Sequence, residues 1–192
     1  MSAVKRAALD ALYAGTDDPW NFRTSDYERQ KYDATIATLP ASRLRHVLEV
    51  GCGNGELARR LAARCDDYTG VDAVDVALEA ARRAVPQGNF VQSYLPCDLP
   101  EGDYDLLVLS EILYFLDAPG LSSLAVQIDS RWPAATVLCV TWLGPSGNPL
   151  EGDEALHLFG AATSRRTRCV RMEATYRIDL FASLTQKEPP CK

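Results

Sequence analysis

The sequence predicts an α/β fold in which a mostly parallel β-sheet carries helices on both of its faces. Short apolar runs alternate with helical patterns along most of the chain, which is typical of parallel strands joined by crossover helices. The apolar runs lack the alternation of half-exposed strands, so both of their faces are expected to be buried. The length of 192 residues favours one domain of ordinary size, residues 1–192.

Two helical stretches come first, at residues 3–13 and 25–39, and an aromatic-rich connector separates them. Ser25, followed three residues later by Glu28, fits a capping box at the start of the second stretch. We interpret residues 1–45 as a helical lid segment that precedes the core of the domain.

The core, residues 46–192, is predicted to form a seven-stranded sheet. Near its end, residues 167–172 and 175–181 alternate apolar with polar residues, which predicts an antiparallel pair of strands at one edge of the sheet. Five buried strands and three helices are expected before that pair. The strands are residues 46–50, 68–71, 89–92, 104–109 and 136–141, and the helices are residues 55–64, 74–84 and 120–132.

The charge balance argues against several classes of partner. With 20 basic and 26 acidic residues and a net charge of −6, no basic surplus is available for nucleic acid. The densest basic cluster, residues 165–168, is interpreted as a solvated strand edge. No apolar run reaches the length of a membrane span, and the N-terminal residues lack a secretion signal. We therefore expect a cytoplasmic monomer or homodimer that binds neither nucleic acid nor membranes.

The cysteines and histidines do not form a metal-binding pattern. The six cysteines include no CxxC pair, and His46 and His157 are the two histidines, so no metal site is expected. Cys52 and Cys139 lie in apolar, strand-like surroundings, which is typical of buried, reduced thiols.

The strongest motif is EVGCGNGE at residues 49–56, between the first buried strand and the following helix. Glycines at such a turn let a ligand approach the backbone. A dinucleotide-binding loop would have glycine where Glu56 stands, and a carboxylate there disfavours a pyrophosphate. The loop therefore suits a nucleoside ligand without phosphates better than a dinucleotide.

This motif, together with Asp72 at the end of the next strand, resembles the class I S-adenosylmethionine-dependent methyltransferases. The resemblance covers residues 47–142 and implies a Rossmann-like fold, with S-adenosylmethionine as cofactor and S-adenosylhomocysteine as product. It implies that the glycine loop lies against the methionine part of the cofactor and that Asp72 binds the ribose hydroxyls. The cofactor contacts that it assigns here are Glu49, Gly51, Gly53, Gly55, Asp72 and Ala73.

One position departs from the family pattern. The Asp or Asn that usually follows the third strand and contacts adenine is replaced by Ser93, with Tyr94 and Leu95 behind it. A serine oxygen is able to accept that hydrogen bond, and the alternative is Asp98 from a shifted loop. Ser110, at the end of the fourth strand, completes the expected cofactor contacts.

Three further segments resemble the nodulation protein S group. They are DPWNFRTSDYERQKY at residues 18–32, LSEILYFL at residues 109–116 and, less closely, residues 152–157. Founding members of that group N-methylate the free amine of a de-N-acetylated chitin oligosaccharide. The resemblance thus implies methyl transfer to a small polar acceptor, with the amine of an amino sugar as first choice.

Aromatic side chains of the lid segment are expected to cover the cofactor and exclude water from the transferring methyl. Their faces also favour a sulfonium cation, although packing of the lid helix onto the sheet would require the same residue types. Arg23, Lys31 or Tyr27 is the expected partner of the cofactor carboxylate. The aromatic residues are Trp20, Phe22, Tyr27 and Tyr32.

An acceptor amine must lose a proton before it attacks a methyl group. Glu111, at the carboxyl end of the fourth strand, is a candidate to accept that proton or to bind sugar hydroxyls. The alternative is a structural role, in which its carboxylate only stabilises the start of a helix. Tyr114, one turn on, lines the acceptor pocket or packs in the core. His157 shares a helix face with Asp153 and is a second candidate base or a structural histidine. Trp142 stacks on a sugar ring or belongs to the core.

Other functions remain open on the sequence alone. An O-methyltransferase of a small hydroxylated metabolite would need a base more than an amine does, so a steep loss of activity in His157→Ala would favour it. A cofactor-binding protein without catalysis is the second alternative. A dehydrogenase is the third, and Glu56 argues against it.

Overall fold

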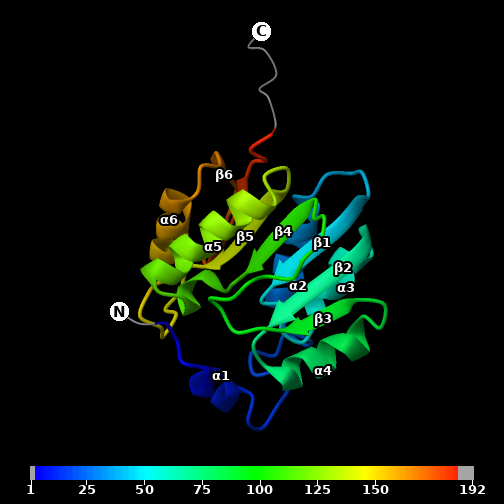
Figure 1. Ribbon diagram of the computed structural model, residues 1–192. Coiled ribbons are helices and arrows are strands. Elements are labelled where there is room, and N and C mark those ends of the chain that lie inside the picture. Colours follow the sequence, from blue (N-terminus) through cyan, green and yellow to red (C-terminus); the bar gives the residue numbers. More distant parts are fainter. Residues whose placement is uncertain (1–2, 186–192) are drawn as a thin grey trace.

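The structure, a computed structural model, describes residues 3–185, which form a seven-stranded sheet with helices on both faces (Figure 1). The strand order is β3-β2-β1-β4-β5-β7-β6. Neighbouring strands from β3 to β5 pair in parallel, and β7 is antiparallel to both β5 and β6. The strands are β1 (Leu44–Val50), β2 (Cys65–Asp72), β3 (Asn89–Gln92), β4 (Leu106–Ser110), β5 (Thr136–Trp142), β6 (Thr167–Met172) and β7 (Tyr176–Phe181). The predicted fold class, including the antiparallel edge, is confirmed.

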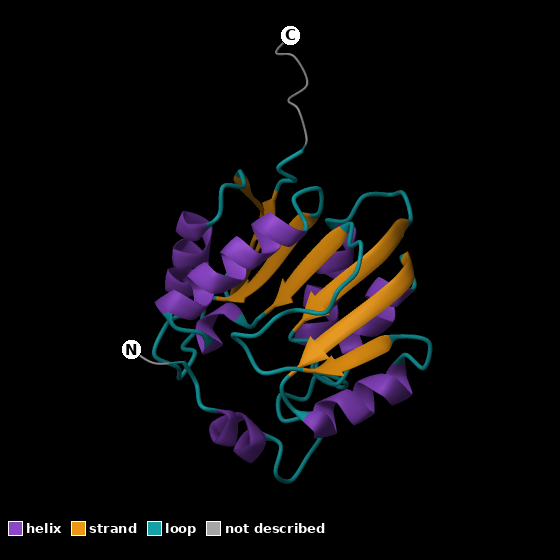
Figure 2. Cartoon of the chain, viewed as in Figure 1, coloured by secondary structure: helices purple, strands orange, loops and turns teal. Residues whose placement is uncertain are grey.

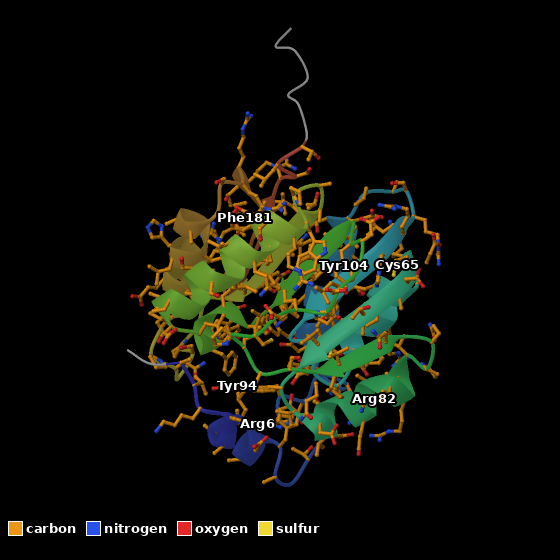
Figure 3. All side chains as sticks on the ribbon, in the orientation of Figure 1. Arg6, Cys65, Arg82, Tyr94, Tyr104 and Phe181 are labelled. Carbon is orange, nitrogen blue, oxygen red and sulfur yellow. The ribbon has the colours of Figure 1, made fainter. Side chains whose placement is uncertain are left out.

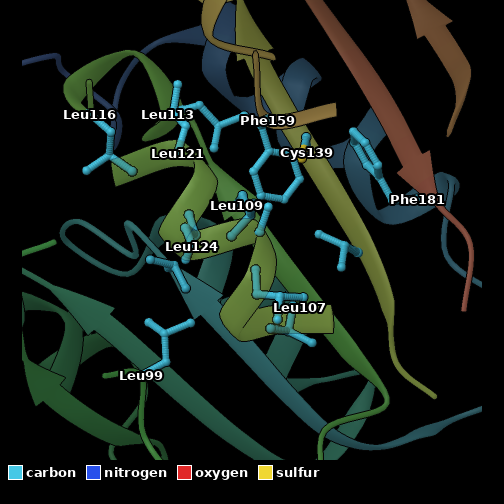
Figure 4. Close-up of a cluster of buried hydrophobic side chains, with 14 of the residues drawn as sticks. Leu99, Leu107, Leu109, Leu113, Leu116, Leu121, Leu124, Cys139, Phe159 and Phe181 are labelled. Carbon is cyan, nitrogen blue, oxygen red and sulfur yellow. The ribbon is translucent and has the colours of Figure 1, made fainter. Parts of the chain in front are cut away.

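Two buried clusters fill the space between the sheet and its helices, because successive residues of each strand point to opposite faces. Leu48 and Val50 of β1 pack with α5 and α6 in one cluster (Figure 4), and Val47 packs with α2, α3 and α4 in the other. The helices are α1 (Arg6–Leu12), α2 (Asp26–Ala37), α3 (Glu56–Ala62), α4 (Asp75–Ala84), α5 (Ala118–Arg131) and α6 (Gly152–Ala162), with a short 3-10 helix η1 at Leu113–Phe115.

Several element boundaries differ from the predictions for local reasons. β2 begins at Cys65, three residues earlier than predicted, because Cys65 and Asp67 already pair with Leu44 and His46 of β1. β4 begins at Leu106, two residues later than predicted, where its pairing with Val47 of β1 and with Thr136 of β5 begins. α5 begins at Ala118 because the Asp117 carboxylate accepts from the Gly120 amide at 3.0 Å, an N-cap the hydrophobic pattern did not reveal.

The lid segment contains two helices that differ in how they attach to the core. α2 packs onto the sheet, and the predicted cap is present, with Ser25 Oγ accepting from the Glu28 amide at 3.2 Å. The carboxylate of Glu28 does not complete the capping box but turns toward Lys31. α1 contains no buried residue and lies apart from the sheet (Figure 2).

The basic cluster at residues 165–168 is only partly solvated. Arg168 is exposed, but Arg165 is 5% exposed, and its guanidinium donates to Asp129 at 2.7 Å and to the carbonyl of Trp132 at 2.8 Å. The interpretation as a solvated edge is therefore wrong for Arg165, whose burial is possible because its donors are paired.

Two sequence-based expectations concern the interior and the membrane. Cys52 and Cys139 are buried free thiols, as predicted, whereas Cys191 lies outside the described residues. No helix among residues 3–185 is both long and apolar enough to cross a membrane.

Candidate functional site

The topology creates a crevice where β1 and β4 lie side by side. The chain leaves β1 for β2 on one side and leaves β4 for β5 on the other. Open α/β sheets bind ligands at such a switch point, beyond the carboxyl ends of the strands. A cavity of about 820 Å³ lies there, lined by the loops after β1 to β5 and by the lid segment. That volume is within the usual range for a small-molecule site.

Gly51 and Gly55 have different structural roles in the loop after β1. Gly51 lines the cavity with φ of 83°, and a Cβ there would lie 1.9 Å from Ile112 Cγ2. Gly55, with φ of 87°, is outside the cavity lining, and its Cβ would meet Ala81 of α4 at 2.8 Å. Gly55 was predicted to contact the cofactor; its position instead allows α3 to pack closely on α4. Gly53 lines the cavity as expected.

Asp72 connects the glycine loop to the loop after β2. Its Oδ2 accepts from the Gly53 amide at 2.9 Å and its Oδ1 from the Val74 amide at 3.0 Å. Burial raises the pKa of this carboxyl, and the backbone hydrogen bonds oppose that rise. Asp72 and Ala73 both line the cavity, and the carboxylate keeps lone pairs for ligand hydroxyls.

Asn54 is a cavity residue that the sequence reasoning missed. Its side chain is buried, with the residue 2% exposed, and neither amide atom has a hydrogen-bond partner among the described residues. Buried polar atoms are normally paired, so this amide is available to a ligand. Its position inside the glycine motif was the signal in the sequence.

The loop after β3 brings Ser93 to the cavity rather than Asp98. Ser93, Tyr94 and Leu95 line the cavity, whereas Asp98 is exposed and lies 3.4 Å from the side-chain nitrogen of Gln127. Tyr94, which is labelled in Figure 3, also reaches the lid, since its hydroxyl donates to the carbonyl of Val4.

Glu49 reaches the cavity from the end of β1 and is 1% exposed. Its Oε2 accepts from the Tyr68 hydroxyl at 2.5 Å. Burial raises the pKa of this carboxyl to about 8, despite that hydrogen bond. Glu49 is thus mostly protonated at neutral pH until a cation approaches it.

The predicted lid aromatics all line the cavity. Trp20 and Phe22 stack with ring centroids 5.4 Å apart, and Phe22 contacts the edge of Tyr32 at 6.4 Å. Tyr13, which the sequence reasoning missed, extends this series through an edge contact with Trp20 at 5.6 Å. Tyr27 also lines the cavity and makes an edge contact with Trp142, with the ring centroids 6.2 Å apart.

Arg23 does not reach the cavity. It is exposed, and its guanidinium donates to both oxygens of Asp17 at 2.7 and 2.8 Å. Because this bidentate pair holds the side chain away from the cavity, the predicted contact with a cofactor carboxylate is not formed by Arg23.

Charged side chains gather where the cavity meets the end of β4. Lys31 Nζ lies 2.8 Å from Glu111 Oε1 and 3.0 Å from Glu28 Oε1. Burial raises the pKa of Glu111, and Lys31 opposes that rise. Glu28, Lys31 and Glu111 line the cavity together with Tyr114 and Trp142, and Ser110, which precedes Glu111 in the chain, lines it as well. Lys31 is therefore already occupied by carboxylates and is poorly suited to a cofactor carboxylate.

His157 lies away from the cavity on the exposed face of α6. The buried face of that helix carries Ala155 and Phe159, which places His157 on the other side. Asp153 does not hold the imidazole, because Arg177 donates to its carboxylate at 2.8 Å. The structure therefore gives His157 no contact with the site. Residues 3–185 also contain no group of three or more His, Cys, Asp or Glu arranged to hold a metal ion.

The comparisons with known proteins place the chain in one family. The sequence model of the family "Nodulation protein S (NodS)" matches residues 6–125. Nodulation protein S of Bradyrhizobium diazoefficiens is 34% identical over 108 residues, 52% of this chain and 50% of that protein. An uncharacterized methyltransferase of Mycobacterium tuberculosis is 31% identical over 140 residues, 68% of this chain and 64% of that protein. The chain spans about half the length of the nodulation S proteins that it matches.

Solved structures share the fold. N-methyltransferase NodS of Bradyrhizobium japonicum, in complex with S-adenosylhomocysteine, aligns with a TM-score of 0.78 at 16% identity and covers 93% of this chain and 98% of that one. A candidate methyltransferase of Pseudomonas syringae aligns with a TM-score of 0.69 at 33% identity, covering 81% and 97%. The chain belongs to the nodulation protein S family and has the Rossmann-like fold of the S-adenosylmethionine-dependent methyltransferases.

Proposed function

We propose that this protein uses S-adenosylmethionine to methylate the amine nitrogen of a small polar acceptor, with an amino sugar as the first choice. The observation that carries the proposal is the composition of the cavity at the switch point. Its glycine loop and Asp72 suit a nucleoside, while Glu111 and Trp142 suit a polar, cationic acceptor. Membership of the nodulation protein S family supports the same chemistry.

The residues present fit the cofactor. Asp72 would bind the ribose hydroxyls, and Ser93 would accept from the adenine amino group. Glu49 would face the ammonium group of the methionine part, and the unpartnered amide of Asn54 would take one of its polar atoms. The tight packing of Gly51 against Ile112 lets the backbone itself form the cavity wall at this point.

Methyl transfer depends more on the orientation of the acceptor and the exclusion of water than on a reactive side chain. A bound cofactor would supply a methyl group activated by the positive charge on its sulfur. Tyr27, Tyr114 and Trp142 would orient the acceptor so that its nitrogen lone pair meets the methyl carbon in line. Glu111 would receive the proton that an acceptor ammonium must lose first.

A methyl-transfer assay tests this proposal. Labelled S-adenosylmethionine is incubated with D-glucosamine, its β-1,4-linked dimer, N-acetyl-D-glucosamine and D-glucose. We expect label only in D-glucosamine and its dimer, the two acceptors with free amines. Glu111→Gln should lower the rate of methyl transfer to them by about 100-fold or more. Label in D-glucose or in N-acetyl-D-glucosamine, whose nitrogen is acylated, would favour an O-methyltransferase. Binding of S-adenosylhomocysteine without transfer to any acceptor would favour a non-catalytic cofactor-binding protein.

A further inference from the structure

Two carboxylates and one ammonium form a buried cluster at the acceptor end of the cavity. Lys31 Nζ lies 2.8 Å from Oε1 of Glu111 and 2.9 Å from Oε2 of Glu28. The side chain of Lys31 is 2% exposed, and the ring of Tyr27 lies 5.3 Å from its ammonium. The cluster therefore carries two negative charges and one positive charge, largely away from solvent.

The cluster connects the lid to the core. Lys31 and Glu28 belong to α2, and Glu111 follows β4, 80 residues later in the chain. A buried lysine without partners would lose its proton, but the two carboxylates outweigh its burial and raise the pKa of Lys31. The lysine thus stays charged and directs its charge at Glu111.

The backbone of Glu111 also indicates a constrained position. Its φ of 54° lies in the left-handed region, which non-glycine residues seldom adopt. Its amide donates to the carbonyl of Val140 at 2.9 Å, which fixes the start of the loop after β4. Strained backbone of this kind concentrates at functional sites, and the ion pair with Lys31 fixes the side chain as well.

The groups that face Glu111 act on its charge in opposite directions. Burial and the nearby Glu28 carboxylate favour the protonated form of Glu111, and Lys31 favours the ionised form. The facing groups come from α2, η1 and the cluster itself. They are Tyr27, Glu28, Lys31, Tyr32 and Tyr114.

We propose that Lys31 is a positioning residue for proton removal, which keeps Glu111 ionised and fixed beside the acceptor nitrogen. This inference rests on the proposed function. In the step concerned, an acceptor ammonium gives one proton to an oxygen of Glu111, leaving a neutral amine with its lone pair and a neutral carboxyl group. Lys31 keeps its own proton throughout, and the cluster changes from a net charge of −1 to zero.

The first test measures the titration of Glu111 in the protein itself. The carboxyl ¹³C signal of Glu111, assigned with Glu111→Gln, is followed against pH in the wild type and in Lys31→Met. Loss of an opposite charge at this distance should raise the midpoint by about one pH unit or more, and Lys31→Arg should return it toward the wild-type value. An unchanged or lower midpoint in Lys31→Met would overturn the proposal.

A second variant keeps the proposal testable where Lys31→Met does not fold. Glu28→Gln keeps the Lys31–Glu111 pair but removes the neighbouring negative charge, so the Glu111 midpoint should fall. A midpoint that stays unchanged or rises in Glu28→Gln would contradict the assigned electrostatics. Thermal unfolding followed by circular dichroism shows which variants are folded.

Kinetics and cofactor binding separate this inference from the proposed function. With D-glucosamine as acceptor, the acid limb of kcat/KM should move to higher pH in Lys31→Met, by the shift that the titration shows. S-adenosylhomocysteine should bind Lys31→Met within about threefold of wild type, since Lys31 is engaged by carboxylates. A shifted titration with an unmoved acid limb would overturn the catalytic role of Lys31. Failure of the wild type to bind S-adenosylhomocysteine would instead overturn the proposed function.

Discussion

At Gly51 the chain leaves β1 in a left-handed conformation, with a φ of 83° that L side chains rarely adopt. An added methyl group would lie 1.9 Å from Ile112 Cγ2 and 2.8 Å from the carbonyl oxygen of Ser110. Because one neighbour is backbone of the adjacent β4, the clash cannot be relieved by a side-chain rotation alone. Gly51 therefore shapes the wall of the cavity and also permits the close packing of the chain at the ends of β1 and β4.

We predict that Gly51→Ala lowers the free energy of unfolding by about 1–3 kcal/mol and lowers the affinity for S-adenosylhomocysteine at least tenfold. Urea unfolding and calorimetric titration measure the two effects. Gly15→Ala is the matched control, because a Cβ at Gly15 meets nothing within 4 Å. Equal stability and affinity in the two variants would contradict the role given to Gly51.

Glu49 should make the stability of the protein depend on pH. Its pKa is raised from 4.5 to about 8 by burial, so between these values the folded state holds a proton that the unfolded state has lost. The stabilisation is complete below pH 4.5 and is lost as the pH rises toward 8, at up to about 1.4 kcal/mol per pH unit. We predict a flatter pH dependence for Glu49→Gln than for the wild type, measured by urea unfolding from pH 5 to 8. The exposed Glu79→Gln should follow the wild type, and parallel curves for Glu49→Gln and wild type would refute the assignment.

At the scale of elements, the strands were the most predictable part of the molecule. β3 and β6 have the predicted bounds, since short apolar runs and alternation both indicate strands. β3 was expected to be covered on both faces, but it lies at the edge of the sheet, and its Asn89 and Gln92 are exposed. The positions of α1 and α2 over the cavity have no such local signal. The ion pair between Lys31 and Glu111 joins residues 80 positions apart, so spacing in the sequence does not reveal it.

Two residues of the candidate site, Arg23 and His157, were wrongly predicted because contacts of this kind are not visible in the sequence. Arg23 was expected at the cavity, but Asp17, six residues away, binds it on the surface. His157 and Asp153 were paired by helical spacing, but Arg177 of the neighbouring β7 takes the carboxylate. In both cases a competing partner decided where the side chain points, and neither residue type nor spacing in the sequence reveals such a partner.

The helix α1 is predicted to act on ligand binding rather than on folding. None of its residues is buried, yet Leu9 and Leu12 line the cavity. The double variant Leu9→Ala/Leu12→Ala should bind S-adenosylhomocysteine about tenfold more weakly. That loss is about 1.4 kcal/mol, which corresponds to the burial of about two methylene groups at about 0.8 kcal/mol each. The unfolding free energy should change little. Val126→Ala, an exposed apolar residue of α5 outside the cavity lining, should change neither quantity. Wild-type affinity in the double variant would show that α1 does not contact the ligand.

At the scale of the whole molecule, the strand order brings together residues from distant parts of the chain. The loop after β1 carries Gly51, the last residue of β2 is Asp72, and the loop after β4 carries Glu111, all at the carboxyl edge of the sheet. Alternating strands and helices predict that such an edge exists. They do not predict the size of the cavity or the buried amide of Asn54, because these depend on how the lid packs over the edge.

The central claim is that this cavity binds the nucleoside of S-adenosylmethionine through Asp72. Calorimetric titration of the wild type and of Asp72→Ala with S-adenosylhomocysteine, with NAD as the control ligand, tests it most directly. We predict micromolar binding of S-adenosylhomocysteine to the wild type, no binding of NAD, and at least tenfold weaker binding to a folded Asp72→Ala. Binding of NAD, binding of neither ligand, or equal affinity in Asp72→Ala would contradict the account.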